Sequence, residues 1–136
     1  MIVVDTNVIC YALISGDKTD LALRVERQDP RWNVPPLWRQ EFLNVLAAST
    51  RAGVIDVGQA GVILRQALDL LISAERAVDM VAALYLAVEH GISAYDAQYI
   101  SLALALQVRC VTEDGRLLTA FPETAVSMAA FCSQTK

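Results

Sequence analysis

Residues 1–9 read MIVVDTNVI, in which a short apolar run at residues 1–4 is followed by an acid, Asp5. The run IVV at residues 2–4 is β-branched and too short for a buried helix, which predicts a strand buried on both faces, as in a parallel sheet. Open α/β sheets bind their ligands in the crevice beyond the carboxyl ends of the strands. Asp5 therefore fits two roles, a functional carboxylate in that crevice and the N-cap of a helix expected over residues 6–15.

The length and composition predict one domain over residues 1–136, with a flexible tail at residues 133–136. The chain is 55% hydrophobic, yet no apolar run approaches the roughly 18 residues that a membrane span requires. The surplus of apolar residues predicts a surface that binds a partner. Because residues 2–4 are expected in the core, we expect no signal peptide and a cytoplasmic protein without membrane attachment.

Cysteine, histidine and charge exclude several kinds of site. Cys10, Cys110 and Cys132 are odd in number and far apart, which predicts neither disulfides nor a CxxC metal site. The single histidine, His90, precedes Gly91 at an expected helix end, which argues against a Ser/His/Asp triad and a histidine-based zinc site. The net charge of −4 means that any contact with nucleic acid has to be local.

The rest of the chain alternates helices with short apolar strands. Further strands are expected at residues 32–34, 109–112 and 125–128, and further helices at 20–27, 37–52, 56–73, 77–90, 93–107 and 117–121. Pro35 and Pro36 stop the second strand, since they cannot both serve a central ladder. This order is that of a three-layer α/β/α domain with a mostly parallel central sheet flanked by helices.

Four acidic residues stand at the expected ends of these elements. Asp5 and Asp114 follow strands, whereas Glu41 and Asp96 lie in the first turns of helices. The carboxyl ends of parallel strands and the N-termini of the helices that follow point to the same edge, so we expect the four carboxylates to meet there. Each also has an ordinary explanation: Asp96 completes a helix cap, Asp114 belongs to an Asp-Gly turn, and Glu41 is a solvated acid.

A pocket lined by carboxylates predicts a metal site. Clustered carboxylates repel one another, so such a pocket is stable mainly when a cation occupies it. Oxygen ligands without thiolate or imidazole select Mg²⁺ or Mn²⁺ over Zn²⁺, and the chemistry they suit is phosphodiester hydrolysis. Glu113 competes with its neighbour Asp114 for a place in the pocket. Alternation along the strand gives Thr112 and Asp114 the same facing, which favours Asp114.

Four motifs, spread over nearly the whole chain, together resemble the PIN-domain family, and specifically the VapC-type toxins of bacterial toxin-antitoxin pairs. They are MIVVDTNVI at residues 1–9, RQEFLNVL at 39–46, ISAYDAQYISLALAL at 92–106 and VTEDGRLL at 111–118. The resemblance implies a Mg²⁺- or Mn²⁺-dependent endoribonuclease with the PIN fold. The residues that it implies are Asp5, Glu41, Asp96 and Asp114 as catalytic acids, the three aspartates among them as metal ligands, and Asn7 and Thr112 as polar support.

The resemblance also implies partners. We expect an RNA substrate, a homodimer and a cognate antitoxin whose C-terminal segment wraps the toxin and blocks the site. Arg39 and Arg116 each lie within two residues of an expected catalytic acid, so they are candidates for contact with RNA phosphate, and surface ion pairs are their alternative role. A PIN-like module that binds RNA or protein without cutting is the alternative function.

Overall fold

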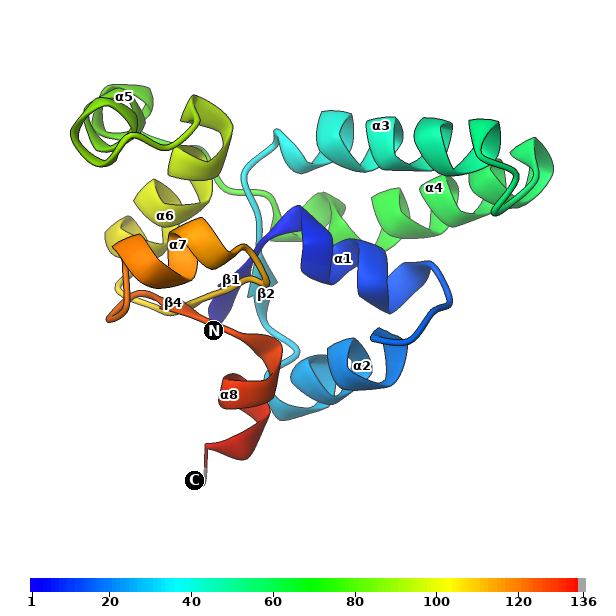
Figure 1. The fold of residues 1–136 in the computed structure, drawn as a ribbon, viewed down its shortest axis with the longest axis horizontal. Coiled ribbons are helices and arrows are strands. Elements are labelled where there is room, and N and C mark those ends of the chain that lie inside the picture. The colour runs from blue at the N-terminus through cyan, green and yellow to red at the C-terminus, as the bar shows by residue number, and fades with distance from the viewer. Residues whose placement is uncertain (135–136) are drawn as a thin grey trace.

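The computed structural model describes residues 1–134, and its centre is a sheet of short parallel strands (Figure 1). The strands are β1 (Ile2–Val4), β2 (Trp32–Asn33), β3 (Cys110–Val111) and β4 (Ala125–Val126), in the order β2-β1-β3-β4. All neighbouring strands pair in parallel. The chain leaves β1 toward β2 on one side and later returns to β3 on the other. The carboxyl end of β1 is therefore the switch point at which such sheets bind ligands.

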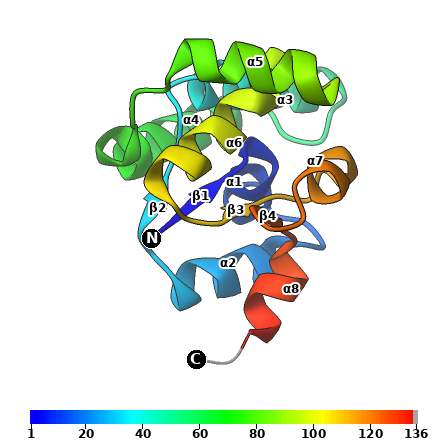
Figure 2. The same ribbon diagram turned by 90° about the vertical axis from the view of Figure 1, so that its left-hand side faces the viewer.

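Helices cover both faces of the sheet. Their bounds are α1 (Thr6–Leu13), α2 (Thr19–Gln28), α3 (Trp38–Arg51), α4 (Val57–Leu71), α5 (Met80–His90), α6 (Ala94–Leu106), α7 (Gly115–Ala120) and α8 (Met128–Ser133), with a 3-10 turn, η1 (Ile72–Ala74), after α4. In Figure 2, α5 lies over α6 beyond one face of the sheet, and α2 and α8 lie together beyond the other. Within residues 1–134, each helix is too short or too polar to cross a bilayer.

The side chains of β1 alternate between two apolar cores. Ile2 and Val4 enter a core formed with α1 to α4 and α8, whereas Val3 enters a second core formed with α5, α6 and α7. Each core lies against one face of the sheet, because successive side chains of a strand point to opposite faces. The predicted three-layer α/β/α architecture and the strand buried on both faces are thus confirmed.

The predicted helix over residues 77–90 is wrong at its start. The backbone N–H of Arg76 donates to the carbonyl oxygen of Val34 at 2.9 Å, and the N–H of Val34 donates to Ala74 at 3.1 Å. The chain therefore runs extended beside the end of β2 before α5 begins. The Asp79 carboxylate accepts the N–H of Ala82 at 3.0 Å and caps the helix at that point.

The predicted strand over residues 125–128 is too long. β4 ends at Val126, because the hydroxyl of Ser127 accepts the N–H of Ala130 at 3.1 Å and begins α8, a helix that the sequence analysis did not predict. The buried residues of this short helix are Met128 and Phe131. The helical spacing of apolar residues therefore occurs once in it, which is too little to predict a helix from the sequence. Of the tail predicted at residues 133–136, Ser133 ends α8, and residues 135–136 lie outside the described residues.

Candidate active site

Asp5 lies at the switch point, directly after β1. Its Oδ1 atom accepts the backbone N–H of Thr6 at 2.8 Å, so it caps α1. Its Oδ2 atom accepts the hydroxyl of Thr112 at 2.7 Å and the side-chain amide of Asn7 at 3.4 Å. The residue is only 6% exposed. Asp5 is therefore the cap of α1 and a buried carboxylate at the carboxyl end of β1, and its functional role stays a prediction.

Electrostatic coupling links Asp5 to other acids. Burial raises the pKa of Asp5 to about 7, against hydrogen bonds that lower it, and the Asp96 and Glu41 carboxylates raise it further. Asp96, half-buried in the first turn of α6, has a pKa raised by burial, by Asp114 and by Glu41. The fold thus brings Asp5, Glu41, Asp96 and Asp114 to one edge of the sheet, from four different segments of the chain.

Asp114 and Asp96 each lie at the start of a helix. The Oδ1 atom of Asp114 accepts the backbone N–H groups of Arg116 at 2.8 Å and Leu117 at 3.2 Å, which caps α7. Asp96 instead donates its backbone N–H to the hydroxyl of Ser93 at 3.0 Å, so Ser93 is the cap of α6. A hydrogen bond from the Ser93 side chain lowers the pKa of Asp96, whereas the Oδ2 atom of Asp114 accepts no hydrogen bond from residues 1–134.

Two buried hydroxyls that the sequence analysis did not single out hold Glu41. The hydroxyl of Tyr99 donates to Oε1 of Glu41 at 2.6 Å, and the hydroxyl of Thr6 donates to the same oxygen at 2.8 Å. Burial and the Glu41 carboxylate raise the pKa of Tyr99. The sequence does place Tyr99 three residues after Asp96, on the same face of one helix. No local pattern predicts that its hydroxyl binds Glu41.

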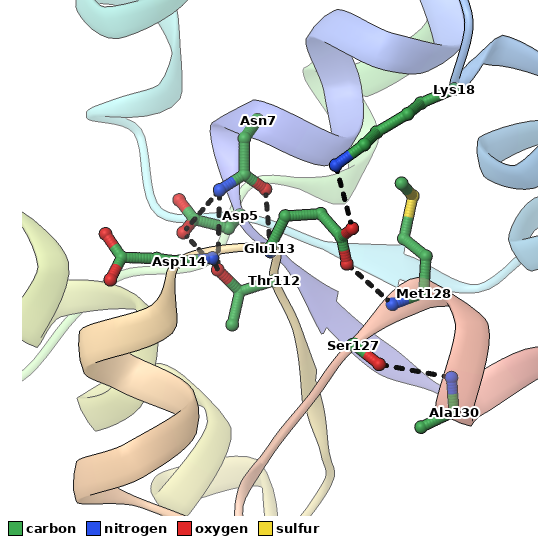
Figure 3. A network of polar contacts seen from close by, with 9 residues as sticks. All are labelled: Asp5, Asn7, Lys18, Thr112, Glu113, Asp114, Ser127, Met128 and Ala130. Atoms are coloured by element: carbon green, nitrogen blue, oxygen red, sulfur yellow. Dashed lines mark hydrogen bonds and ion pairs between the residues drawn. The ribbon is translucent and has the colours of Figure 1, made fainter.

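Thr112 organises the loop that follows β3. Its hydroxyl donates to Asp5 and accepts the backbone N–H of Asp114 at 3.0 Å, while the Asn7 amide lies 3.4 Å from the same oxygen (Figure 3). Glu113 points the other way. Its Oε1 atom lies 3.2 Å from Nζ of Lys18, and its Oε2 atom accepts the N–H of Met128 at 2.9 Å (Figure 3). Asp114 therefore lies with the other acids, and Glu113 lies outside them.

Comparison with known proteins now gives the family. The family model described as PIN domain matches residues 2–123. This chain belongs to the PIN domain family. PIN domains are generally nucleases. A solved structure, PAE2754 from Pyrobaculum aerophilum, is similar over 98% of this chain and 97% of its own, with a TM-score of 0.76 and 21% identity, a likeness that shows the fold. No curated protein matches the sequence.

Arg39 is bound in an ion pair within this PIN domain. Its Nε and Nη2 atoms donate to the Glu75 carboxylate at 2.6 and 2.9 Å, and the indole N–H of Trp38 donates to the same carboxylate at 2.8 Å. These hydrogen bonds hold the pKa of Glu75 below its usual value. The structure shows this ion pair, and contact of Arg39 with RNA phosphate stays a prediction. Arg116, by contrast, lowers the pKa of Asp96 and so lies within electrostatic range of the acids.

Glu75 is expected to stabilise the domain through Trp38. Trp38 is fully buried, so Glu75→Ala leaves its indole N–H without an acceptor, at a cost of about 1–3 kcal/mol. Urea unfolding measures this loss as a lower midpoint with an unchanged slope. Glu89→Ala, which removes an exposed carboxylate from α5, is the matched control. A midpoint equal to that of the control would show that water replaces Glu75 without cost.

The candidate donors at the acidic edge of this PIN domain are carboxylate oxygens. Within residues 1–134, no three Asp, Glu, His or Cys side chains lie close enough together to hold an ion directly. Mg²⁺ takes one or two carboxylates directly and keeps several waters, so it does not require such a group. The donor set consists of carboxylates, and Asp5 is a buried acid beside two others. This chemistry fits a hydrated Mg²⁺ or Mn²⁺ ion.

Proposed function

We propose that this PIN domain is a Mg²⁺- or Mn²⁺-dependent endoribonuclease that hydrolyses RNA phosphodiester bonds at the edge formed by Asp5, Glu41, Asp96 and Asp114. The observation that carries the proposal is the buried Asp5 carboxylate at the switch point of the sheet, within electrostatic range of Asp96 and Glu41. Four acids at this edge are costly to the folded protein unless a bound cation offsets their repulsion.

In this proposal each side chain has a stated task. Asp5, Asp96 and Asp114 would hold the ion, one or two of them directly and the rest through its waters, and the bound ion would polarise the phosphate and lower the pKa of a water. Thr112 and Asn7 fix the orientation of the Asp5 carboxylate by their hydrogen bonds. Glu41, with its Oε2 atom free of hydrogen bonds from residues 1–134, accepts a proton from the attacking water or orients it. Arg116 contacts a phosphate of the RNA.

Asp96→Asn tests the proposal. We expect purified protein to cut structured RNA in Mn²⁺ and to lose activity in EDTA. Asp96→Asn is expected to lower the rate at least about a hundredfold, because it removes a charged ligand of the metal. Asp69→Asn, which makes the same change at an exposed position of α4, should cut at the wild-type rate. Equal rates for the two variants would overturn the metal site.

The alternative function is a PIN module that binds RNA or protein without cutting. The same experiment separates the two functions, because a silent module retains RNA in a binding assay and yields no new RNA ends with Mn²⁺.

We further propose that the protein acts in the cytoplasm as the toxin of a toxin-antitoxin pair. An apolar cavity of about 420 Å³ supports the binding of an antitoxin segment, and Leu13, Leu23, Trp32 and Leu71 lie among its walls. Exposed apolar side chains on α5 support a homodimer: Met80, Val81, Leu84, Tyr85 and Val88. Expression is expected to arrest growth, and coexpression of the neighbouring small reading frame should relieve the arrest. Growth without arrest would overturn the toxin role.

A further inference from the structure

The carboxylate of Glu41 is fixed where three helices meet. Glu41 lies on α3, Thr6 on α1 and Tyr99 on α6. Both hydroxyls donate to the same atom, Oε1, which brings their two oxygens into close contact. A glutamate side chain has several rotatable bonds, so ordering it costs entropy that these two hydrogen bonds offset.

The two donors are rigid and buried. Tyr99 is fully buried, with its ring inside the core formed with α5, α6 and α7. Thr6 is 6% exposed and β-branched, so its hydroxyl has few rotamers to choose from. A phenylalanine would fill the space of Tyr99 without a polar atom to satisfy. The Tyr99 hydroxyl therefore contributes little to packing and contributes a specific hydrogen bond to Glu41.

The two carboxylate oxygens of Glu41 differ in their hydrogen bonds. Oε1 is held by Tyr99 and Thr6, whereas Oε2 accepts no hydrogen bond from residues 1–134. Glu41 lies within electrostatic range of both Asp5 and Asp96. Tyr99 and Asp96 are three residues apart on one helix, so a single rigid element carries Asp96 and the donor that holds Glu41.

We propose that Tyr99, with Thr6, is a positioning residue that aims the free oxygen of Glu41 at the metal and the attacking water. This inference rests on the proposed nuclease function and deepens it. Groups that orient the ligands and bases of a metal site typically account for 10–100-fold in metal affinity or activity. The hydroxyl pair is such a group for Glu41.

Tyr99→Phe tests the inference. We expect a 10–100-fold lower kcat with an unchanged KM for RNA, and a weaker affinity for Mn²⁺ alone, measured by calorimetry on the RNA-free protein. Tyr11→Phe is the matched control, because it removes the hydroxyl of a partly exposed tyrosine of α1 and should leave all three quantities unchanged. Wild-type kcat and Mn²⁺ affinity in Tyr99→Phe would overturn the inference.

Further variants separate positioning from stability. Thr6→Ser keeps the hydroxyl and should retain activity, whereas Thr6→Val keeps the shape and should lose it. This pair tests the inference even if Tyr99→Phe folds poorly. In a Glu41→Gln background, Tyr99→Phe should have little added effect, because Tyr99 acts through Glu41. A full additional loss in that background would overturn the inference. A wild-type protein that neither binds Mn²⁺ nor cuts RNA overturns the proposed function itself.

Discussion

Asp5→Asn is expected to abolish metal-dependent RNA cleavage, lowering the rate about a thousandfold or more, and to stabilise the metal-free protein at pH 8. The first effect follows because Asn cannot supply the charge that binds the cation, and a thousandfold corresponds to about 4 kcal/mol of transition-state stabilisation. The second follows because Asp5 is a buried carboxylate whose ionised form is disfavoured by burial and by two neighbouring acids.

Two measurements on Asp5→Asn check both effects. Cleavage of a labelled RNA in Mn²⁺ gives the rate, and thermal unfolding in EDTA at pH 8 gives the stability, expected to rise by at least about 5 °C. Asp69→Asn serves again as the control, since it changes the same chemical group at the surface. A variant that loses activity and also unfolds at a lower temperature would show that the Asp5 carboxylate stabilises the fold and would contradict the predicted electrostatic strain.

Stabilisation by Mn²⁺ is expected to depend steeply on pH. In the metal-free folded protein the pKa of Asp5 is about 7, raised from 3.8, so the folded state holds this proton more tightly than the unfolded state. The stability from this group is therefore fully present below about pH 4 and is lost as the pH rises through 7. A cation binds the ionised form, so its apparent affinity should fall about tenfold per pH unit below 7.

Thermal unfolding between pH 5.5 and 8.5, with and without Mn²⁺, measures this linkage. The rise in Tm on adding Mn²⁺ should be small at pH 5.5 and large at pH 8.5, because stabilisation grows with ligand concentration relative to Kd. Asp5→Asn should flatten the dependence. An equal rise at every pH in the wild-type protein would mean that the cation does not compete with the Asp5 proton.

Local sequence rules account for the residues whose roles depend on their own element. The run at residues 2–4 predicts a buried strand. Asp5 follows that strand directly, so the strand order alone places it at the switch point of the sheet. Asp114 is predicted over Glu113 by alternation, and the structure has Glu113 facing Lys18. These predictions need only the period of a strand and the direction of the chain.

The features that sequence reasoning missed depend on contacts between distant segments. α5 begins three residues later than predicted, because the backbone of Arg76 is hydrogen-bonded to that of Val34. No local sequence pattern predicts this bond between distant segments. Arg39 lies close to Glu41 in sequence, yet Glu75, a residue from another segment, binds its guanidinium. Tyr99 has the spacing of a core residue, and its role became visible only when the fold placed Glu41 beside its hydroxyl.

A hydrogen bond between Glu113 and the first residue of α8 links that helix to the loop at the acidic edge. Glu113 stands between Thr112 and Asp114, and its carboxylate holds the first N–H of α8. The PIN family match ends at residue 123, before that helix begins. A helix beyond the residues that match the family model is thus hydrogen-bonded to the loop that carries Thr112 and Asp114, so we expect substitutions in α8 to shift that loop and, with it, the proposed acidic site.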